Sequence, residues 1–473
     1  MRSPPAIPAH RPPVRHGCLL LTLCLGVLLA QIDTSVVNLA LRPIATALHL
    51  GVAPLQWIID GYNLTYALFL LTGGLLGDLF GRRRIFIAGV GIFCAGCLAC
   101  GLADDPATLI LGRVVAGLGA ALLLPASLAI LRVEWADPVE RGRALGVWAG
   151  CNGLAFAVGP TLGGLLIQGF GWRSVFLIVL PLGALTCVLA RLSVPESADP
   201  QGRRFDPAGQ ILGAVALGGL ALSAIEGRAA PGLLAVTLPA VVFAAILFAA
   251  AERRHGDAAL VPLALFRIPA FAGAIGATAA MTFGMYGLLF LLPLCWQAAD
   301  AGAVPLGPVQ AGLGLLPMAA AFFAVSRYSG TLTERFGTRA TTAGGTGIIG
   351  FGLLVVALTE GGRPMALAQA GLVLTGLGMG TNTGPLMGVA VASVASARSG
   401  TASALINVAR MVGATLGVAG LGTLYALCSG SHRALSVALA TGGLVQLAGA
   451  LLAWSTIGRD GARGQAPPPS RVP

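Results

Sequence analysis

The chain has 473 residues, of which 56% are hydrophobic and only 10% are charged, whereas soluble domains carry about 25% charged residues. Water cannot be the main solvent of such a chain, and about 20 residues per membrane span leave no room for a separate soluble domain. The formal charge of +11 comes from 29 basic residues, all arginine, scattered between apolar runs. This scatter excludes a nucleic-acid-binding surface, and the absence of lysine indicates a GC-rich genome.

Apolar runs bounded by arginine, proline or acidic residues predict fourteen membrane-spanning helices. The first six cover roughly 17–40, 55–77, 85–102, 107–131, 142–168 and 174–192. A pair follows at 208–225 and 231–251, and the last six cover 271–294, 308–326, 341–358, 366–390, 400–425 and 434–456. We therefore predict an all-α polytopic membrane protein with an N-terminal six-helix bundle at 17–192, a linking helix pair at 208–251 and a C-terminal six-helix bundle at 271–456.

The arginines predict the orientation of these helices. With the N-terminus inside, the inner segments hold 22 arginines and the outer loops hold five. The positive-inside rule then places both termini in the cytoplasm, as tails at 1–16 and 457–473. Arg113 and Arg410 are left within predicted spans, where an arginine needs a specific reason.

The sequence repeats itself at a nearly constant offset. The pattern Gly-x-Leu-x-acid-x-Phe-Gly occurs at 74–81 and again at 330–337, an offset of 256 residues, and Gly-x-Thr-Leu-Gly occurs at 159–163 and at 413–417, an offset of 254. These offsets predict two parallel six-helix halves separated by the extra pair. A binding site between such halves near the bilayer midplane is the expected arrangement.

The segment 73–84, Gly-Gly-Leu-Leu-Gly-Asp-Leu-Phe-Gly-Arg-Arg-Arg, closely resembles the signature of the major facilitator superfamily between helices 2 and 3. Its glycines allow a tight turn and close helix contact, and its acid and arginines can form a charge network that latches the outward-facing state. The alternative is that the arginines only anchor the topology. Leu79 replaces the basic residue usual in the family, which thins the network. The cytoplasmic gate is assigned to Gly74, Asp78, Gly81, Arg82, Arg83 and, from the second half, Glu334.

The first predicted helix contains Gln-Ile-Asp-Thr-Ser-Val-Val-Asn-Leu-Ala-Leu at 31–41, which resembles the stretch typical of the fourteen-helix drug:proton antiporters. A carboxylate at this depth costs about 2.5–3.5 kcal/mol on insertion scales, so Asp33 is expected to be functional. Desolvation and a nearby cation would set its affinity for a proton. Arg42-Pro43 follows, where the family usually has proline first, and leaves the end of this helix open.

The fourth predicted helix supplies a cation. Arg-Val-Val-Ala-Gly-Leu-Gly-Ala at 113–120 resembles the family's proton-transfer motif. Arg113 cannot lose its proton, so the resemblance implies that it pairs with a group on helix 1 or 2 and couples transport to protons together with Asp33. The alternative is an arginine that snorkels to the inner face.

The fifth predicted helix resembles the motif that distinguishes antiporters from symporters, with Ala155 in place of its first glycine. Proline and glycine bend a helix, and small faces let a partner helix pack closely. Ordinary close packing is the alternative reading, and packing is itself the means by which the motif would prevent proton leak. The motif residues are Gly153, Gly159, Pro160, Gly163 and Gly164.

A substrate pathway is assigned to polar residues on three predicted helices. The Trp57-x4-Tyr62 pattern of helix 2 is usual in the family, but an acid at Asp60 is not; near the outer end it could attract a cationic substrate or simply be hydrated. Asn407 and Arg410 of helix 13 also fit the family's pattern, and the arginine could contact substrate or close the inner gate. The assigned residues are Asn38, Asp60, Tyr62, Asn407 and Arg410.

The expected function is proton-coupled export of amphipathic drugs or antibiotics by alternating access, across the cytoplasmic membrane of a bacterium with a GC-rich genome. Its partners would be a small amphipathic substrate, protons and membrane lipid, with no nucleic acid, no cofactor and no metal; the three cysteines at 94, 97 and 100 are read as packing. The chain would act as a monomer, because one chain contains both halves.

Three alternatives are open. A dedicated transporter of one metabolite, siderophore or lipid-like molecule would use the same fold. A membrane enzyme is disfavoured because all five histidines lie outside the predicted spans and no metal-ligand cluster or phosphate-binding loop is found. A sensor without transport would normally need a soluble output domain, and the loops are too short for one.

Overall fold

The computed structural model describes residues 16–199, 206–227, 229–255, 261–298, 305–359, 365–395, 398–428 and 433–458, and these residues contain helices and no strand. The predicted tails at 1–16 and 457–473 lie almost entirely outside the described residues. The first half comprises α1 (His16–Leu48), α2 (Val52–Phe80), α3 (Arg82–Leu102), α4 (Pro106–Glu134), α5 (Pro138–Phe170), α6 (Ser174–Leu177) and α7 (Val179–Ser193). The hairpin is α8 (Pro207–Glu226) and α9 (Pro231–His255). After η2 (Leu263–Arg267), the second half comprises α10 (Pro269–Trp296), α11 (Pro308–Ser326), α12 (Ser329–Phe336), α13 (Thr338–Ala357), α14 (Met365–Ala392), α15 (Ser399–Leu427) and α16 (Ala434–Thr456).

Among the described residues, thirteen helical stretches are long and apolar enough to cross a membrane, counting α6 and α7 as one. The long helix outside this set is α14, which has 28 residues and no charged side chain. Gln369, Asn382 and several threonines and glycines lower its hydropathy. Because its neighbours α11 and α13 cover it, α14 does not need a lipid-compatible surface on every side, and it remains our prediction for the fourteenth span.

The observed helices follow the predicted runs, with three differences. α1 continues to Leu48 because Pro43 is accommodated inside the helix instead of ending it. The sixth run is broken at Ile178 into α6 and α7. In the second half, the repeat at 330–337 forms the separate short helix α12, whereas its counterpart at 74–81 belongs to α2.

Asp-Pro pairs begin three of the helices. Asp105, Asp137 and Asp206 each precede a proline and accept a hydrogen bond from a backbone N–H in the first turn. The proline loses nothing at this position because its missing N–H would have no helical partner, and the carboxylate satisfies one of the donors that remain. At the exposed Asp105, the hydroxyl and amide of Thr108 lower the pKa of the carboxyl.

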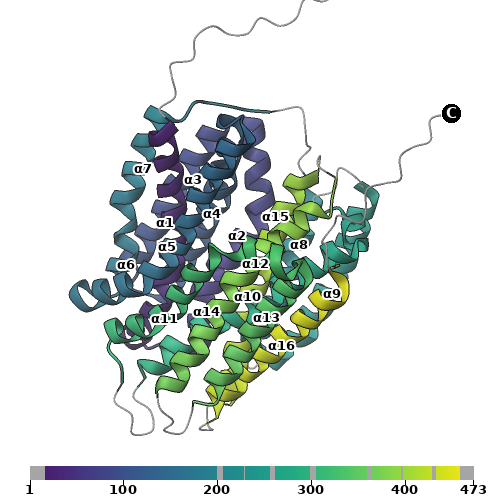
Figure 1. Cartoon of the computed structure of the whole chain (residues 1–473). Coiled ribbons are helices and arrows are strands. Elements are labelled where there is room, and N and C mark those ends of the chain that lie inside the picture. The colour runs from purple at the N-terminus through teal and green to yellow at the C-terminus, as the bar shows by residue number, and fades with distance from the viewer. Residues whose placement is uncertain are drawn as a thin grey trace, which may run out of the picture.

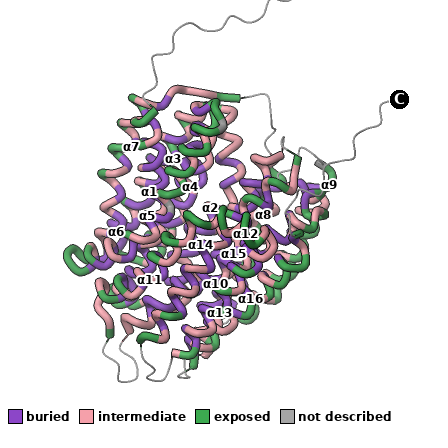
Figure 2. The backbone as a smooth tube through the Cα atoms, viewed as in Figure 1, coloured by how far each residue is buried: buried purple, intermediate pink, exposed green. Residues whose placement is uncertain are grey.

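The two halves repeat the same packing pattern. In the first half, α1 packs on α5 and α7, and α4 packs on α2 and α3; in the second, α10 packs on α15 and α16, and α14 packs on α11 and α13. The halves meet along two corresponding seams, α2 with α15 and α5 with α11. Figure 1 shows the first half beside the second, and Figure 2 shows buried residues where helices face one another. The predicted internal repeat is therefore present in three dimensions.

Both chain ends of the helical region lie on one side. At the start of α1, His16 lies 5.1 Å from Trp135 at the end of α4, measured between ring centres. A Cβ on Gly400, at the start of α15, would lie 3.7 Å from Nη1 of Arg132 of α4. α16 ends beside the start of α10, where Thr456 is a neighbour. We call this side, uppermost in Figure 1, the terminal face and the opposite side the distal face.

The hairpin docks on one seam only. Trp57 of α2 donates to Glu226 of α8 at 2.9 Å, and Thr423 of α15 donates to the carbonyl of Ala224 at 2.7 Å. Nearer the terminal face, Gln210 of α8 donates to the carbonyl of Leu68 at 2.6 Å. α8 therefore bridges α2 of the first half and α15 of the second.

Candidate functional site

A buried ion pair joins two helices of the first half. Arg113 of α4 donates from Nη1 to Oδ2 of Asp33 of α1 across 2.6 Å, and the side chains are 1% and 0% exposed. Nε of Arg113 donates to the carbonyl of Ile58 of α2 at 2.9 Å, and the guanidinium lies 4.5 Å from the ring centre of Tyr62. Arg113 thus joins α1, α2 and α4 at one point, and its head group does not snorkel to a face.

Glycines let the backbones approach closely enough for this contact. A Cβ on Gly117 of α4 would lie 2.5 Å from the carbonyl oxygen of Tyr62, and a Cβ on Gly112 would lie 2.9 Å from that of Gly96 of α3. Only residues without a Cβ fit there. Cys97 completes the surroundings, with its Sγ 3.9 Å from Oδ1 of Asp33.

The other polar residues assigned to a substrate pathway are separated along the interior. Asn38 is buried and donates to the carbonyl of Thr34 in its own helix at 3.1 Å. Asn407 likewise donates to the carbonyl of Ser403 at 2.8 Å. Each of these two amides therefore donates a hydrogen bond to a backbone carbonyl of its own helix.

Arg410 is linked to the first half through tyrosines. Its guanidinium interacts electrostatically with the hydroxyls of Tyr66 of α2 and Tyr286 of α10, and its Nε has no hydrogen-bond partner among the described residues. Tyr66 in turn lies 6.1 Å from Tyr62, between ring centres. Our sequence analysis missed Tyr66 and Tyr286, although Tyr66 follows Tyr62 by one helical turn.

Asp60 requires a correction. Its side chain is 0% exposed, and among the described residues neither carboxylate oxygen has a well-formed hydrogen bond, with the amide of Asn63 as its polar neighbour. The reading of Asp60 as a hydrated acid near the outer end is therefore wrong. Position along α2 suggested exposure, but the packing of α15 against this face of α2 removes the residue from solvent.

The charge network of the 74–81 segment is present and includes an unexpected member. Nε and Nη2 of Arg82 donate to Oδ1 of Asp78 at 2.9 and 2.7 Å. Glu196, just after α7, accepts from the backbone N–H of Arg83 at 3.0 Å and pairs with the guanidinium groups of Arg83 and Arg84 at 3.7 and 3.6 Å. No motif marks Glu196, which the return of α7 to the α2–α3 turn brings into place.

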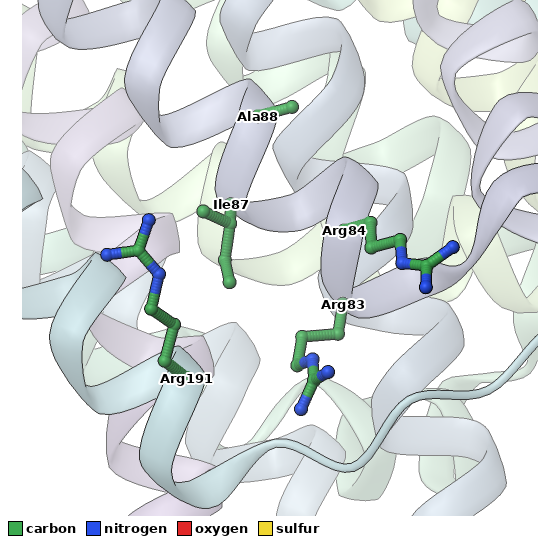
Figure 3. Close-up of a pocket in the computed structure, with 5 residues that line it drawn as sticks. All are labelled: Arg83, Arg84, Ile87, Ala88 and Arg191. Carbon is green, nitrogen blue, oxygen red and sulfur yellow. The ribbon is translucent and has the colours of Figure 1, made fainter.

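Backbone contacts reinforce this network. The N–H of Arg82 donates to the carbonyl of Ser197, and the N–H of Asp199 donates to the carbonyl of Asp78, both at 2.8 Å. Beside them lies a cavity of about 460 Å³. Figure 3 shows its lining, with Arg83 and Arg84 from the start of α3 and Arg191 from α7 around Ile87 and Ala88.

The second half does not reproduce the network. Glu334 lies on α12, which has no buried residue, and it is exposed. Its neighbour Arg335 lies over the ring of Phe336, at 5.4 Å. Among the described residues no ion pair of Glu334 is found, so the gate role assigned to it has no contact in this structure.

The glycines of the antiporter motif line contacts of α5 with two helices. Gly159 and Gly163 face Ser35 and Val36 of α1, and a Cβ on Gly163 would lie 2.8 Å from Cγ1 of Val36. Toward the second half, a Cβ on Gly164 would lie 2.7 Å from the carbonyl oxygen of Pro308 of α11.

The rest of the motif also touches α11. The carbonyl of Pro160 lies against Gly312, and a Cβ on Gly153 would lie 3.5 Å from the rings of Phe322 and Phe323. Gly153, Pro160 and Gly164 therefore form one side of the α5–α11 seam, whereas Gly159 and Gly163 pack on α1.

Comparisons with known proteins agree with this architecture. A model of the Major Facilitator Superfamily matches residues 23–418. The chain is 37% identical over 413 residues to the multidrug resistance protein Stp of Mycobacterium tuberculosis, covering 86% of this chain and 76% of that protein. It is 33% identical to the drug efflux pump JefA of the same species, covering 88% and 82%. It is 31% identical to the methylenomycin A resistance protein of Streptomyces coelicolor, covering 95% and 94%.

Among solved structures, a D-xylose–proton symporter matches with a TM-score of 0.67 at 16% identity, covering 95% of this chain and 99% of that one. This likeness concerns the fold alone. The family match extends over most of the chain, and the two packed halves with their charge network between α2 and α3 agree with it. The chain belongs to the Major Facilitator Superfamily and is a membrane transporter, not an enzyme.

Proposed function

We propose that this transporter exports amphipathic drugs or antibiotics in exchange for protons. The observation that carries the proposal is the Asp33–Arg113 ion pair, 2.6 Å long and 0–1% exposed. Arg113 keeps its charge at all relevant pH values, so the state of the pair depends on Asp33 alone. Protonation of Asp33 would remove the attraction and leave Arg113 held by the carbonyl of Ile58 and the ring of Tyr62.

This change can be transmitted to the helices that open the transporter. Asp33 lies on α1, whose next turn holds Ser35 and Val36, the residues that face the glycines of α5. α5 forms the α5–α11 seam between the halves. A proton on Asp33 would therefore act one turn from the α1–α5 contact, and α5 forms one side of a seam that must part for alternating access.

The arginines support an orientation of the protein in the membrane. Arg82, Arg83, Arg84 and Arg132 lie at the terminal face, and the positive-inside rule assigns such a face to the cytoplasm. The relatives are named for multidrug resistance, drug efflux and antibiotic resistance, which supports outward movement of drugs across the bacterial cytoplasmic membrane. The proton gradient would supply the energy without a cofactor, and one chain with both halves would suffice as a monomer.

A dedicated exporter of one metabolite, siderophore or lipid-like molecule would have the same ion pair and seams. The test that separates the two is the breadth of cargo moved by one preparation.

Coupling is tested in proteoliposomes with an imposed pH gradient and ethidium as a fluorescent probe. We expect gradient-driven movement in the wild type and in Asp104→Asn, a control acid that is 90% exposed and paired with Arg173. We expect none in Asp33→Asn, because its amide cannot exchange a proton. If the pH gradient still drives ethidium movement in Asp33→Asn, Asp33 does not couple transport to protons.

A further inference from the structure

Asp60 lies in the seam between the two halves. It shares one face of α2 with Gln56, one turn before it, and with Asn63, one turn after it. Gln56 marks which helix this face meets, because its Nε2 donates to the carbonyls of Val418 and Ala419 of α15 at 2.9 and 2.8 Å. Asp60 therefore faces α15, the helix of the second half across the seam.

The surroundings of Asp60 contain polar atoms without partners. Both oxygens of its carboxylate, Nδ2 of Asn63 and Oγ1 of Thr415 are buried and make no well-formed hydrogen bond with described residues, and the amide of Asn63 is the polar neighbour of the carboxylate. Thr415 precedes Ala419 by one turn of α15, so it lies on the α2-facing side of that helix. Buried polar atoms are normally satisfied, and a group of unsatisfied ones in one seam indicates a site that changes partners.

Two charged groups of the neighbouring helices have partners elsewhere. On α4, Arg113 pairs with Asp33 of α1, and on α8, Glu226 accepts from the indole of α2. On α15, the guanidinium of Arg410 lies near the hydroxyls of Tyr66 and Tyr286, and its Nε makes no hydrogen bond with a described residue. No ion pair between Asp60 and a described cation is formed.

An ionised carboxylate cannot be held in such a place. A buried charge without a counter-ion or hydrogen bonds is very costly, and the group takes up a proton instead. We propose that Asp60 is a second proton-binding site of this transporter and that it holds its proton while the α2–α15 seam is closed. It is distinct from Asp33, which keeps an arginine partner in the same conformation.

Gln56 stands between Asp60 and the distal solution. A cavity of about 400 Å³ at the distal face is lined by Gln56 and by residues of α2, α8 and α15, among them Ile225 and Thr423. Asp60 lies one turn deeper than this lining. Parting of the seam at the distal face would break the hydrogen bonds of Gln56 to Val418, Ala419 and Thr423 of α15 and open a path for a proton from this cavity to Asp60.

The proposal rests on the proposed exchange of cargo for protons, and it adds a proton to each cycle. Its first test needs no cargo. Infrared spectroscopy of the purified full-length chain at neutral pH reads the C=O stretch of protonated carboxyl groups. We expect such a band in the wild type and in Asp104→Asn, and we expect Asp60→Asn to lose it.

A second variant covers the case in which Asp60→Asn does not fold. Asp60→Glu keeps a carboxyl group in the seam, so the band should remain at a shifted frequency. If neither substitution alters the band, Asp60 is ionised and the proposal is wrong.

The role of Gln56 is read from hydrogen–deuterium exchange of the same band. Asp60 is 0% exposed, so exchange in the wild type should be slow. Gln56→Ala removes the hydrogen bonds of Gln56 across the seam and should speed exchange roughly tenfold. Equal exchange rates would mean that Gln56 does not control access.

Transport then separates the two proton sites. With ethidium as the probe, the reversal potential in liposomes gives the number of protons exchanged per molecule. Asp60→Asn should lower this number by a proton per cycle while gradient-driven movement persists. Loss of coupling in Asp33→Asn tests the proposed function by itself, and the infrared band of Asp60 does not depend on that outcome.

Discussion

Gly81 and Gly337 occupy equivalent positions in the two halves, each immediately before a helix and each with a positive φ, of 106° and 83°. Gly81 donates to the carbonyl of Gly77, and Gly337 donates to that of Thr333. Positive φ is accessible to glycine and strained for other residues, so the repeat at 74–81 and 330–337 preserves a backbone shape as well as a sequence. The halves differ in what surrounds that shape.

This difference predicts unequal effects of the same substitution. Alanine at either position should destabilise the protein by about 1 kcal/mol or more, because of the positive φ. Gly81→Ala should cost more than Gly337→Ala, since its Cβ would also lie 2.7 Å from Oε1 of Glu196 and would displace that oxygen from the backbone N–H of Arg83. Thermal unfolding in detergent measures both, with Gly91→Ala as a control at a helical position with open space. Equal losses at the two sites would show that the Glu196 contact is unimportant.

The ion pair of Asp33 and Arg113 predicts a rescue. Arg113→Ala should destabilise the protein by about 3–5 kcal/mol, because it leaves a buried carboxylate without a partner. The double variant Asp33→Asn with Arg113→Gln contains no buried charge at this point and should recover most of the folded protein, but not proton-driven movement. The yield of monodisperse protein and transport in liposomes measure the two effects. A double variant as unstable as Arg113→Ala would contradict this account.

The ion pairs of Glu196 with Arg83 and Arg84 are expected to weaken as the salt concentration rises. Both pairs are partly exposed, and such pairs contribute about 0–1 kcal/mol and weaken with salt. Glu196→Gln should therefore change overall stability little but speed hydrogen–deuterium exchange in residues 194–199. Raising the salt concentration should bring the wild type toward the variant. If neither Glu196→Gln nor added salt changes the exchange rate, the order of residues 194–199 comes from backbone hydrogen bonds alone.

The close contact of Gly164 with α11 predicts that a larger side chain at this position causes a proton leak. A Cβ there would lie 2.7 Å from a backbone oxygen of α11, which cannot move aside as a flexible side chain can, so Gly164→Ala must push α5 away from α11. We expect a folded protein with faster passive proton leak and weaker gradient-driven movement. Gly169→Ala is the matched control, since a Cβ there meets nothing within 4 Å. Leak is read from a pH dye inside liposomes, and identical leak in the two variants would argue against a sealing role for the motif.

The sequence located the helices because lipid imposes a continuous apolar run on every span. It also indicated Asp33 and Arg113, since charges at that depth need a reason. The pairing partner was left between helices 1 and 2, and Arg113 in fact bonds to both, through Asp33 and the carbonyl of Ile58. Pro43 suggested that the first helix ends near residue 40, but α1 continues through this proline to Leu48.

Other parts of the site depended on tertiary packing. Glu196 follows Val194 and Pro195 in a segment without a pattern, and only the path of α7 brings it to the arginines of α3. Asp60 lies eight residues after the start of α2, which suggested hydration, and only the contact of α15 reveals its burial. Neither fact is encoded in local periodicity.

The hairpin of α8 and α9 makes the two seams unequal. α2–α15 carries α8 across it, joined by Glu226 on one side and by the carbonyl of Ala224 on the other, whereas α8 makes its extensive contacts with α2, α15 and α9 rather than with α5 or α11. A hydrophobic solute dissolved in the surrounding lipid would therefore meet α8 over the α2–α15 seam, whereas the hairpin does not cover the α5–α11 seam. If cargo enters from the bilayer, the flank between α5 and α11 is the one that the hairpin leaves uncovered.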